Sequence, residues 1–161
     1  MAMIICGMLW FAAISVGLMA GVYFTFSTFV MRSLDAIESP SGMLAMQSIN
    51  RVIQRSLFLP LFFASTLACL VLAIVAVTDL SGRGAIAMLA GSALYIVGMF
   101  VVTVIANVPL NNALEATDAH TADGEAMWRR YMQRWTVWNH VRTLSCTAAC
   151  ALLICALLQT A

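Results

Sequence analysis

The sequence predicts an all-α integral membrane protein, a four-transmembrane-helix up-down bundle with helices that extend from one membrane face. Of the 161 residues, 63% are hydrophobic and 9% are charged, whereas a soluble domain has roughly 45–50% apolar and about 25% charged residues. Four runs are apolar for about 18 residues or more, enough to cross the hydrocarbon core of a bilayer. Two amphipathic segments adjoin these runs, so we expect helices to continue beyond the membrane.

The four predicted spans belong to one domain that takes in the whole chain, 1–161. Backbone amides have no water to bind in hydrocarbon, so an apolar run without the alternation of a barrel strand must be a helix. The spans are about 3–30, 57–78, 85–106 and 136–158.

Two of the three connections hold amphipathic helical extensions, at about 40–56 and about 124–135. Ser39 is a suitable N-cap, and Pro40 suits the first helical turn. An extension and its span together exceed the roughly 30 Å thickness of the hydrocarbon core. We therefore expect both extensions to run into the following spans and to project from the same membrane face.

Two prolines should change the course of the second and third spans. A proline lacks the amide hydrogen and clashes with the preceding helical turn. Pro60 should therefore kink the second helix near its entry by freeing the carbonyl of Ser56. Pro109 should end the third helix, because it pushes Val108 away from helical angles.

The arginines are distributed unequally between the two ends of the predicted bundle. Arg83 lies in the short connection between the second and third spans. By the positive-inside rule, the two long connections should be cytoplasmic and both termini outside, in the cell membrane, here a bacterial inner membrane. Seven arginines lie in or beside the long connections: Arg32, Arg51, Arg55, Arg129, Arg130, Arg134 and Arg142.

The composition argues against several classes of protein and ligand. The net charge is +1 and lysine is absent, so we expect no nucleic-acid partner. The five cysteines form no Cys-x-x-Cys pair, and the two histidines are not spaced as metal ligands. We therefore expect neither a metal nor another cofactor.

Small residues recur every four positions on the first span, at Ala13, Gly17 and Gly21. Such a stripe lets another helix approach closely. We expect it to serve helix packing and to be a candidate surface for a homo-oligomer, with membrane lipid around the rest of the bundle.

Polar side chains gather at one end of the predicted bundle. In an up-down arrangement the ends of spans one and three lie beside the starts of spans two and four. Only 16 residues, 143–158, form the apolar run after Arg142, so its side chain should lie at or just inside the hydrocarbon boundary. A charge there faces the bundle, finds a partner or snorkels to the headgroups. The polar end is therefore either a pocket or an ordinary headgroup contact.

Four separated strings carry a resemblance to a known family. They are residues 20–31 (AGVYFTFSTFVM), 45–51 (AMQSINR), 107–111 (NVPLN) and 134–143 (RWTVWNHVRT). Together they resemble the anthrone oxygenase-like family of small four-span membrane proteins, over nearly the whole chain. The resemblance implies oxidation of an anthrone to an anthraquinone without metal or flavin.

Chemistry of that kind needs a base for the acidic ring methylene of the substrate and a group that stabilises the resulting anion. His140 would be the base. Arg142 would hold the enolate oxygen, with Asn107 and Asn139 as neutral donors. His140 and Arg142 are about 200° apart around a helix, so both face one ligand only if the helix start is distorted. The substrate-binding candidates are Tyr23, Asn50, Arg51, Asn111, Trp135 and Trp138.

Two functions stay open. The first is a cofactor-free oxygenase acting on an apolar aromatic, anthrone- or quinol-like molecule that enters from the membrane. The second is a non-catalytic membrane protein whose polar end binds a lipid, a small molecule or a partner protein. Transport ranks below both, because the chain has neither an inverted repeat nor an acidic residue deep in any span.

Overall fold

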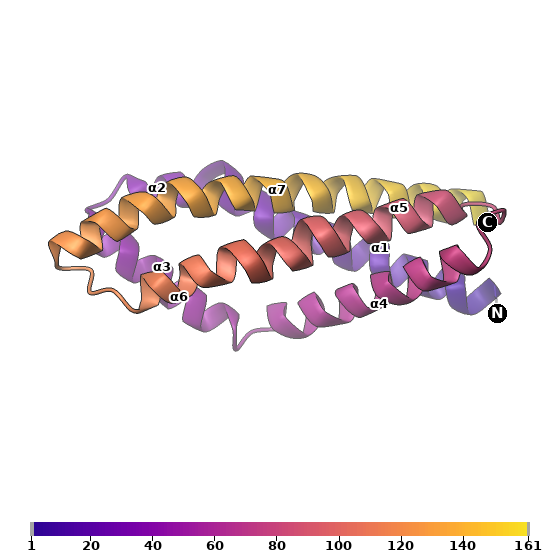
Figure 1. Ribbon diagram of the computed structural model, residues 1–161, viewed down its shortest axis with the longest axis horizontal. Helices are drawn as coiled ribbons and strands as arrows, with labels where there is room; N and C mark the ends of the chain where they lie inside the picture. Colours follow the sequence, from indigo (N-terminus) through magenta and orange to yellow (C-terminus); the bar gives the residue numbers. More distant parts are fainter. Residues whose placement is uncertain (1, 161) are drawn as a thin grey trace.

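The computed structural model describes residues 2–160, which form an antiparallel bundle of four long helical rods with shorter helices at one end (Figure 1). No strand occurs within this range, so the all-α prediction is confirmed. All four rods are long and apolar enough to cross a membrane. The elements are α1 (Ala2–Thr25), η1 (Phe26–Val30), α2 (Met31–Asp35), α3 (Ser39–Ile53), α4 (Phe58–Thr78), α5 (Ala85–Tyr95), η2 (Ile96–Val101), η3 (Thr103–Asn107), α6 (Val108–Glu115) and α7 (Ala122–Thr160).

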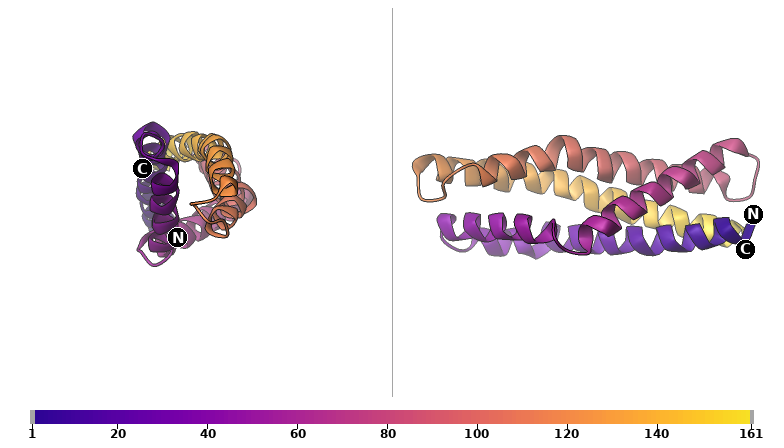
Figure 2. Two further views of the ribbon diagram at one scale, coloured as in Figure 1. Left: turned by 90° about the vertical axis from the view of Figure 1, so that its left-hand side faces the viewer. Right: turned by 90° about the horizontal axis from the view of Figure 1, so that it is seen from below.

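Both chain ends lie beside the short turn between α4 and α5, at the end of the bundle away from the shorter helices (Figures 1 and 2). Gly84 closes this turn with φ of +76°, a left-handed conformation that favours glycine. The rods pack in the cyclic order α1, α7, α5 and α4. α4 runs obliquely to the other three, as the right-hand view of Figure 2 shows.

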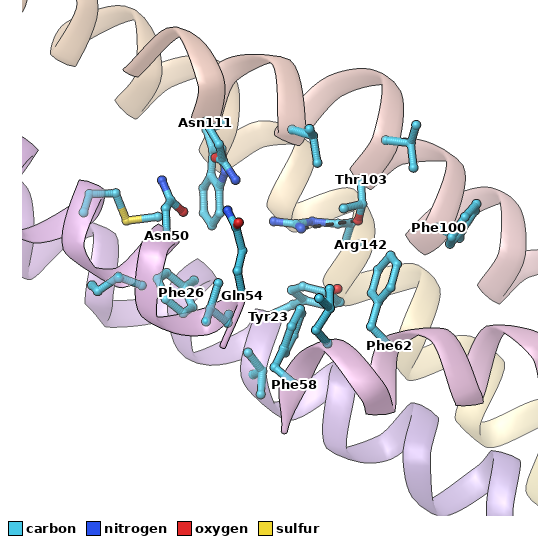
Figure 3. A pocket seen from close by; sticks show the side chains of 18 of the residues that line it. Tyr23, Phe26, Asn50, Gln54, Phe58, Phe62, Phe100, Thr103, Asn111 and Arg142 are labelled. Atoms are coloured by element: carbon cyan, nitrogen blue, oxygen red, sulfur yellow. Dashed lines mark hydrogen bonds between the residues drawn. The ribbon is translucent and has the colours of Figure 1, made fainter. Parts of the chain in front are cut away.

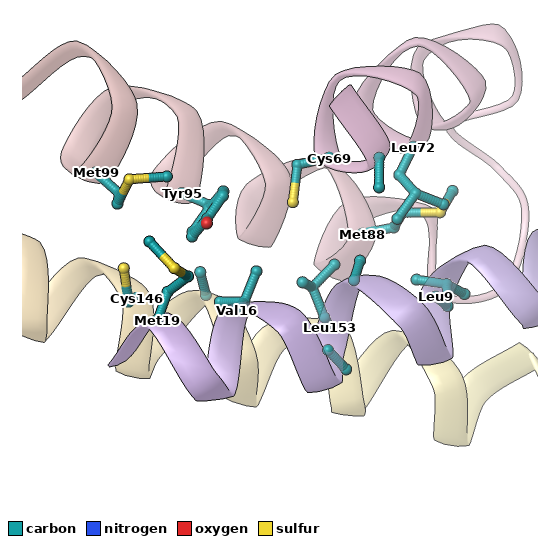
Figure 4. Packing of buried hydrophobic residues seen from close by; sticks show 14 of the residues in the cluster. Leu9, Val16, Met19, Cys69, Leu72, Met88, Tyr95, Met99, Cys146 and Leu153 are labelled. Atoms are coloured by element: carbon teal, nitrogen blue, oxygen red, sulfur yellow. The ribbon is translucent and has the colours of Figure 1, made fainter. Parts of the chain in front are cut away.

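The bundle core consists of aliphatic, methionine, cysteine and a few aromatic side chains, Tyr95 among them, that interdigitate between the four rods (Figure 4). Small residues let α1 and α7 approach closely: the Cys150 Sγ lies 3.4 Å from the carbonyl oxygen of Ala13. The Cβ of a residue replacing Gly17 would lie 3.4 Å from the same sulfur. Two residues of the small-residue stripe thus pack within the chain, while Gly21 is exposed. The homo-oligomer stays a prediction.

A second core holds the shorter helices together and forms what we call the headpiece: α2, α3, α6 and the first turns of α7. Trp128, Tyr131 and Trp135 stack along one face of α7, with ring centroids 6.0 and 5.7 Å apart. Gln47 Nε2 donates to the carbonyl oxygen of Leu114 at 2.8 Å and so ties α3 to the end of α6. The headpiece caps one end of the bundle.

Two sequence predictions about the start of the second span are wrong. The extension at about 40–56 does not run into the second span, because the chain leaves the helix over residues 54–57. Pro60 then lies in the first turn of α4, where an amide has no intrahelical acceptor, so the predicted kink is replaced by a full break. The other extension does continue into its span, as the unbroken α7.

Pro109 does not end the third rod, which continues to Glu115. The π-helical segment η3 directly precedes the turn that holds Pro109. Its hydrogen bonds have the wider spacing of a π-helix, so the regular α-helical pattern is already interrupted where Pro109 lacks an amide hydrogen. The first rod also extends beyond the predicted end at Val30, as far as Asp35.

We predict that Gly98→Ala destabilises the bundle. A Cβ at this position in η2 would overlap the Oγ and Cβ of Ser145 on α7, and overpacking costs about 1–3 kcal/mol. The midpoint of thermal unfolding in detergent should fall, and Ser145→Gly in the same chain should restore it. Gly7→Ala is the matched control, because no atom lies within 4 Å of the added Cβ. Equal midpoints for the two single variants would contradict this packing.

Candidate functional site

A cavity of about 440 Å³ lies where the bundle meets the headpiece (Figure 3). Its size is that of small-molecule pockets, about 300–1,000 Å³. Three local features occur at this level: the break between α3 and α4, the π-helical η1, and the pair η2 and η3. π-helical turns widen a helix locally and are frequent at functional sites. The cavity is lined by polar, aromatic and aliphatic side chains from all four rods and the headpiece, including Tyr23, Phe26, Asn50, Gln54, Phe58, Phe62, Phe63, Phe100, Thr103, Val104, Val108, Asn111, Asn112, Trp135 and Arg142.

The guanidinium of Arg142 lies at the centre of this cavity, and its residue is 5% exposed. Its Cζ is 4.3 Å from the ring centroid of Tyr23 and 5.0 Å from that of Trp135. Cation–π contacts of this kind stabilise a desolvated cation by about 2 kcal/mol. The Nη1 donates weakly to Thr103 Oγ1 at 3.4 Å.

Arg142 has no carboxylate partner among the described residues. The ion pairs of this part of the chain are Arg51 with Glu115 and Arg129 with Glu125, all on the exposed surface of the headpiece. A buried charge without a counter-ion is costly. The cavity is therefore a place where an anionic group would gain a strong interaction.

Asn139 holds the guanidinium in position from behind the cavity. Its Oδ1 accepts a hydrogen bond of 2.8 Å from Arg142 Nη2. Its Nδ2 donates to the carbonyl oxygen of Tyr23 at 2.8 Å and to Ser27 Oγ at 2.7 Å. Thr143 Oγ1 lies 2.9 Å from the same Ser27 hydroxyl. One buried asparagine thus links α1, η1 and α7 to the cation.

Several polar atoms of the cavity wall lack a hydrogen-bond partner. Of the seven buried, unpaired side-chain atoms found in the described residues, four belong to residues that line the cavity. Buried polar groups are normally satisfied, so these atoms are available to hydrogen-bond with water or with a ligand in the cavity. The four atoms are Tyr23 Oη, Asn50 Nδ2, Trp135 Nε1 and Arg142 Nε.

The structure brings together five of the residues predicted for the site. Residues 135, 139 and 142 share one face of α7 because they are three or four positions apart. Asn139 and Asn107 are buried next to the wall, and Asn107 Nδ2 donates to the carbonyl oxygen of Trp135 at 3.3 Å. The five that line the cavity are Tyr23, Asn50, Asn111, Trp135 and Arg142.

Three other predicted site residues lie elsewhere. His140 and Trp138 are on the exposed outer face of α7, and Arg51 is exposed in its ion pair with Glu115. α7 is regular at this point, so the distortion needed to turn His140 towards Arg142 does not occur. The His140 ring thus lies outside the cavity and gains no support from this geometry, and its role as the base stays a prediction.

Sequence reasoning missed the aromatic part of the wall. Phe58 and Phe62 are one turn apart on α4, and the Phe62 ring lies 5.5 Å from that of Phe100 on η2. Their spacing of four positions is a signal for a shared helix face, but apolar positions are too common in a membrane span for this signal to single them out. Gln54 was missed because the break after α3 turns it towards the cavity.

Neither a carboxylate nor an imidazole lines the cavity among the residues that the structure describes. No group of three His, Cys, Asp or Glu within this part of the chain is close enough to hold a metal. The arrangement can therefore bind a flat, anionic, oxygen-bearing ring through one cation, several neutral donors and aromatic walls.

Four membrane-length helices, a helical headpiece and a buried arginine in an aromatic cavity define a small integral membrane protein with a cationic, aromatic-lined pocket. The chain belongs to the anthrone oxygenase family, because the sequence model described as "Anthrone oxygenase" matches residues 46–152. The match includes Asn50, Asn111, Asn139 and Arg142. No curated protein and no solved structure matches the chain.

We predict that Asn139→Leu lowers the stability of the protein. The leucine removes three hydrogen bonds, so Ser27 and Arg142 each lose a partner. Each buried polar group left unsatisfied lowers the free energy of unfolding by roughly 1–3 kcal/mol. Thermal unfolding in detergent measures the effect. His140→Leu, at the exposed neighbouring position, is the matched control and should keep the wild-type midpoint. The role given to Asn139 is wrong if both variants unfold at the wild-type temperature.

Proposed function

We propose that the protein is a cofactor-independent oxygenase that oxidises an apolar aromatic substrate, anthrone- or quinol-like, in this cavity. The observation that carries the proposal is the buried guanidinium of Arg142, which faces the cavity without a carboxylate partner among the described residues. The reaction named for the family passes through an anion, and this cation is placed to hold one.

The chemistry needs only the substrate and dioxygen. Loss of a proton from the ring methylene of an anthrone gives an enolate, an electron-rich anion that reduces dioxygen. The ring carbon then forms a bond to oxygen, and the resulting hydroperoxide loses water. In balance, the methylene carbon loses two hydrogens and gains a carbonyl oxygen, while dioxygen supplies that oxygen and the oxygen of one water.

The cavity residues divide into anion-holding and ring-holding groups. Arg142 would hold the enolate oxygen by charge and hydrogen bonding, the preorganised stabilisation that favours formation of an anion. Tyr23 Oη and Trp135 Nε1 offer further donors. The rings of Phe58, Phe62 and Phe100 would contact the faces or edges of a flat substrate (Figure 3).

The proton has no imidazole or carboxylate acceptor in the described wall of the cavity. We infer that the cation itself favours ionisation of the bound substrate and that the proton passes to water at the exposed side, near Gln54 and Asn112. The same lack of a base favours the second candidate function, in which the cavity binds a lipid, a small molecule or a partner without chemistry.

We predict that Arg142→Met lowers the rate of oxygen uptake with anthrone about 10²-fold or more, the usual effect of removing an oxyanion-stabilising group. Arg142→Lys should keep part of the activity, because it keeps the charge but loses the planar donor fork. An oxygen electrode measures uptake by the purified protein in detergent, with the spontaneous rate of heat-inactivated protein subtracted.

His140→Ala is the control for this experiment and should stay within about twofold of wild type, because its ring is outside the cavity. If Arg142→Met keeps full activity, Arg142 is not the anion-holding group. If the wild-type protein binds anthrone but takes up no oxygen, the non-catalytic function replaces the oxygenase.

A further inference from the structure

We propose that the natural substrate is a membrane-dissolved amphiphile: an acidic aromatic ring that carries a hydrocarbon chain. The ring would bind beside Arg142 in the orientation it has in the bilayer, and the chain would leave the cavity sideways into the lipid. The proposal rests on the proposed function for the chemistry of the ring, and on the geometry below for the chain.

The cavity straddles the boundary of the hydrocarbon core. α4 has 21 residues, about 30 Å of helix, which is just the thickness of that core. With the α4–α5 turn at one boundary, Phe58 lies close to the other, because the oblique α4 covers slightly less than its own length along the bundle axis. Asn50, Gln54 and Asn111 lie on the headpiece side of this level, whereas Phe62 and Phe100 lie on the hydrocarbon side (Figure 3).

The order of side chains across this boundary matches an amphiphile in a leaflet. The amide groups come first, together with the ring of Phe26. The guanidinium of Arg142 and the phenol of Tyr23 follow at the level of Phe58, and the rings of Phe62 and Phe100 come last (Figure 3). An amphiphile in a bilayer has the same order, with its polar edge at the headgroups and its chain towards the midplane. Such a molecule would enter without turning over and without taking polar atoms into hydrocarbon.

A side window connects the apolar part of the cavity to the lipid. Phe63, Val104 and Val108 all line the cavity, yet their side chains are also 55%, 49% and 39% exposed on the outer surface. On the inner side of the window, the ring centroid of Phe100 lies 5.5 Å from that of Phe62 and 6.5 Å from that of Phe63. These ring contacts close the cavity towards the centre of the bundle. The window between α4 and the η3–α6 segment is therefore the apolar way out.

The window predicts selectivity by shape rather than by affinity. Lipid tails are as apolar as the window, so a chain gains little by passing from lipid into protein. Its free passage, however, decides whether a chain-bearing ring reaches Arg142. A bulky side chain in the window should therefore act against chain-bearing substrates more than against chainless ones.

The first test compares anthrone with an anthrone that carries a decyl chain, in Val104→Trp and Ile105→Trp. Ile105 is the matched control, because it is the next residue, is 67% exposed and does not line the cavity. We expect the ratio of kcat/KM for the decyl compound to that for anthrone to fall about tenfold or more in Val104→Trp. In Ile105→Trp the ratio should stay within about twofold of wild type. Equal ratios in both variants overturn the proposal.

The second test reads binding and does not depend on turnover. A decyl anthrone with a diazirine at the end of its chain is photolysed with the wild-type protein in vesicles under argon. We expect cross-links to α4 and to the η2–α6 segment around the window, suppressed by excess decyl anthrone and weakened in Val104→Trp. Labelling spread evenly over the lipid-facing sides of all four rods, unchanged by the competitor, overturns the proposal.

The two tests separate the inference from the proposed function. If anthrone is oxidised but the ratio is unchanged in Val104→Trp, the oxygenase stands and the chain-bearing substrate is wrong. If neither compound is oxidised but window cross-links form and are competed, the oxygenase is wrong and the site for a chain-bearing ring stands.

Discussion

The cationic guanidinium of Arg142 is buried inside the bundle, and much of the surrounding structure offsets the cost of that burial. An arginine at the centre of a membrane helix costs about 2.5–3.5 kcal/mol by insertion measurements. Here two aromatic rings, one asparagine oxygen and one threonine hydroxyl share the stabilisation of the charge. These neutral groups hold the cation without cancelling its charge, so an anionic ligand still meets a full positive charge.

The polar contacts that hold Arg142 also join the bundle to the headpiece. Asn139 connects α7 to the carbonyl oxygen of Tyr23 and to Ser27, where α1 passes into η1. The stacked rings of α7 then continue from Trp135 into the headpiece core. The headpiece core and the surroundings of the cation are therefore in direct contact through Trp135.

The sequence was sufficient to predict the four spans and the polar end, because long apolar runs and the few polar residues leave little choice in a bilayer. It also named Arg142 and Asn139 as candidates for one site, and the structure brings them together because they are three positions apart on α7. The break over residues 54–57 could not be predicted, because helix α3 ends where tertiary packing of the headpiece requires it. Pro109 gave the wrong helix end, because a π-helical segment accommodates the proline. The phenylalanine wall has no sequence signature among so many apolar residues.

The unbroken course of α7 over 39 residues has a consequence for how this protein can vary. Each residue inserted or deleted between Trp135 and Arg142 would rotate one end of the rod against the other by about 100°. A single deletion would thus carry the arginine out of the cavity, although every side chain of the site would still be present. Related chains should therefore differ in length within their connections but keep this interval constant, so that its spacing is conserved more strictly than most of its residues.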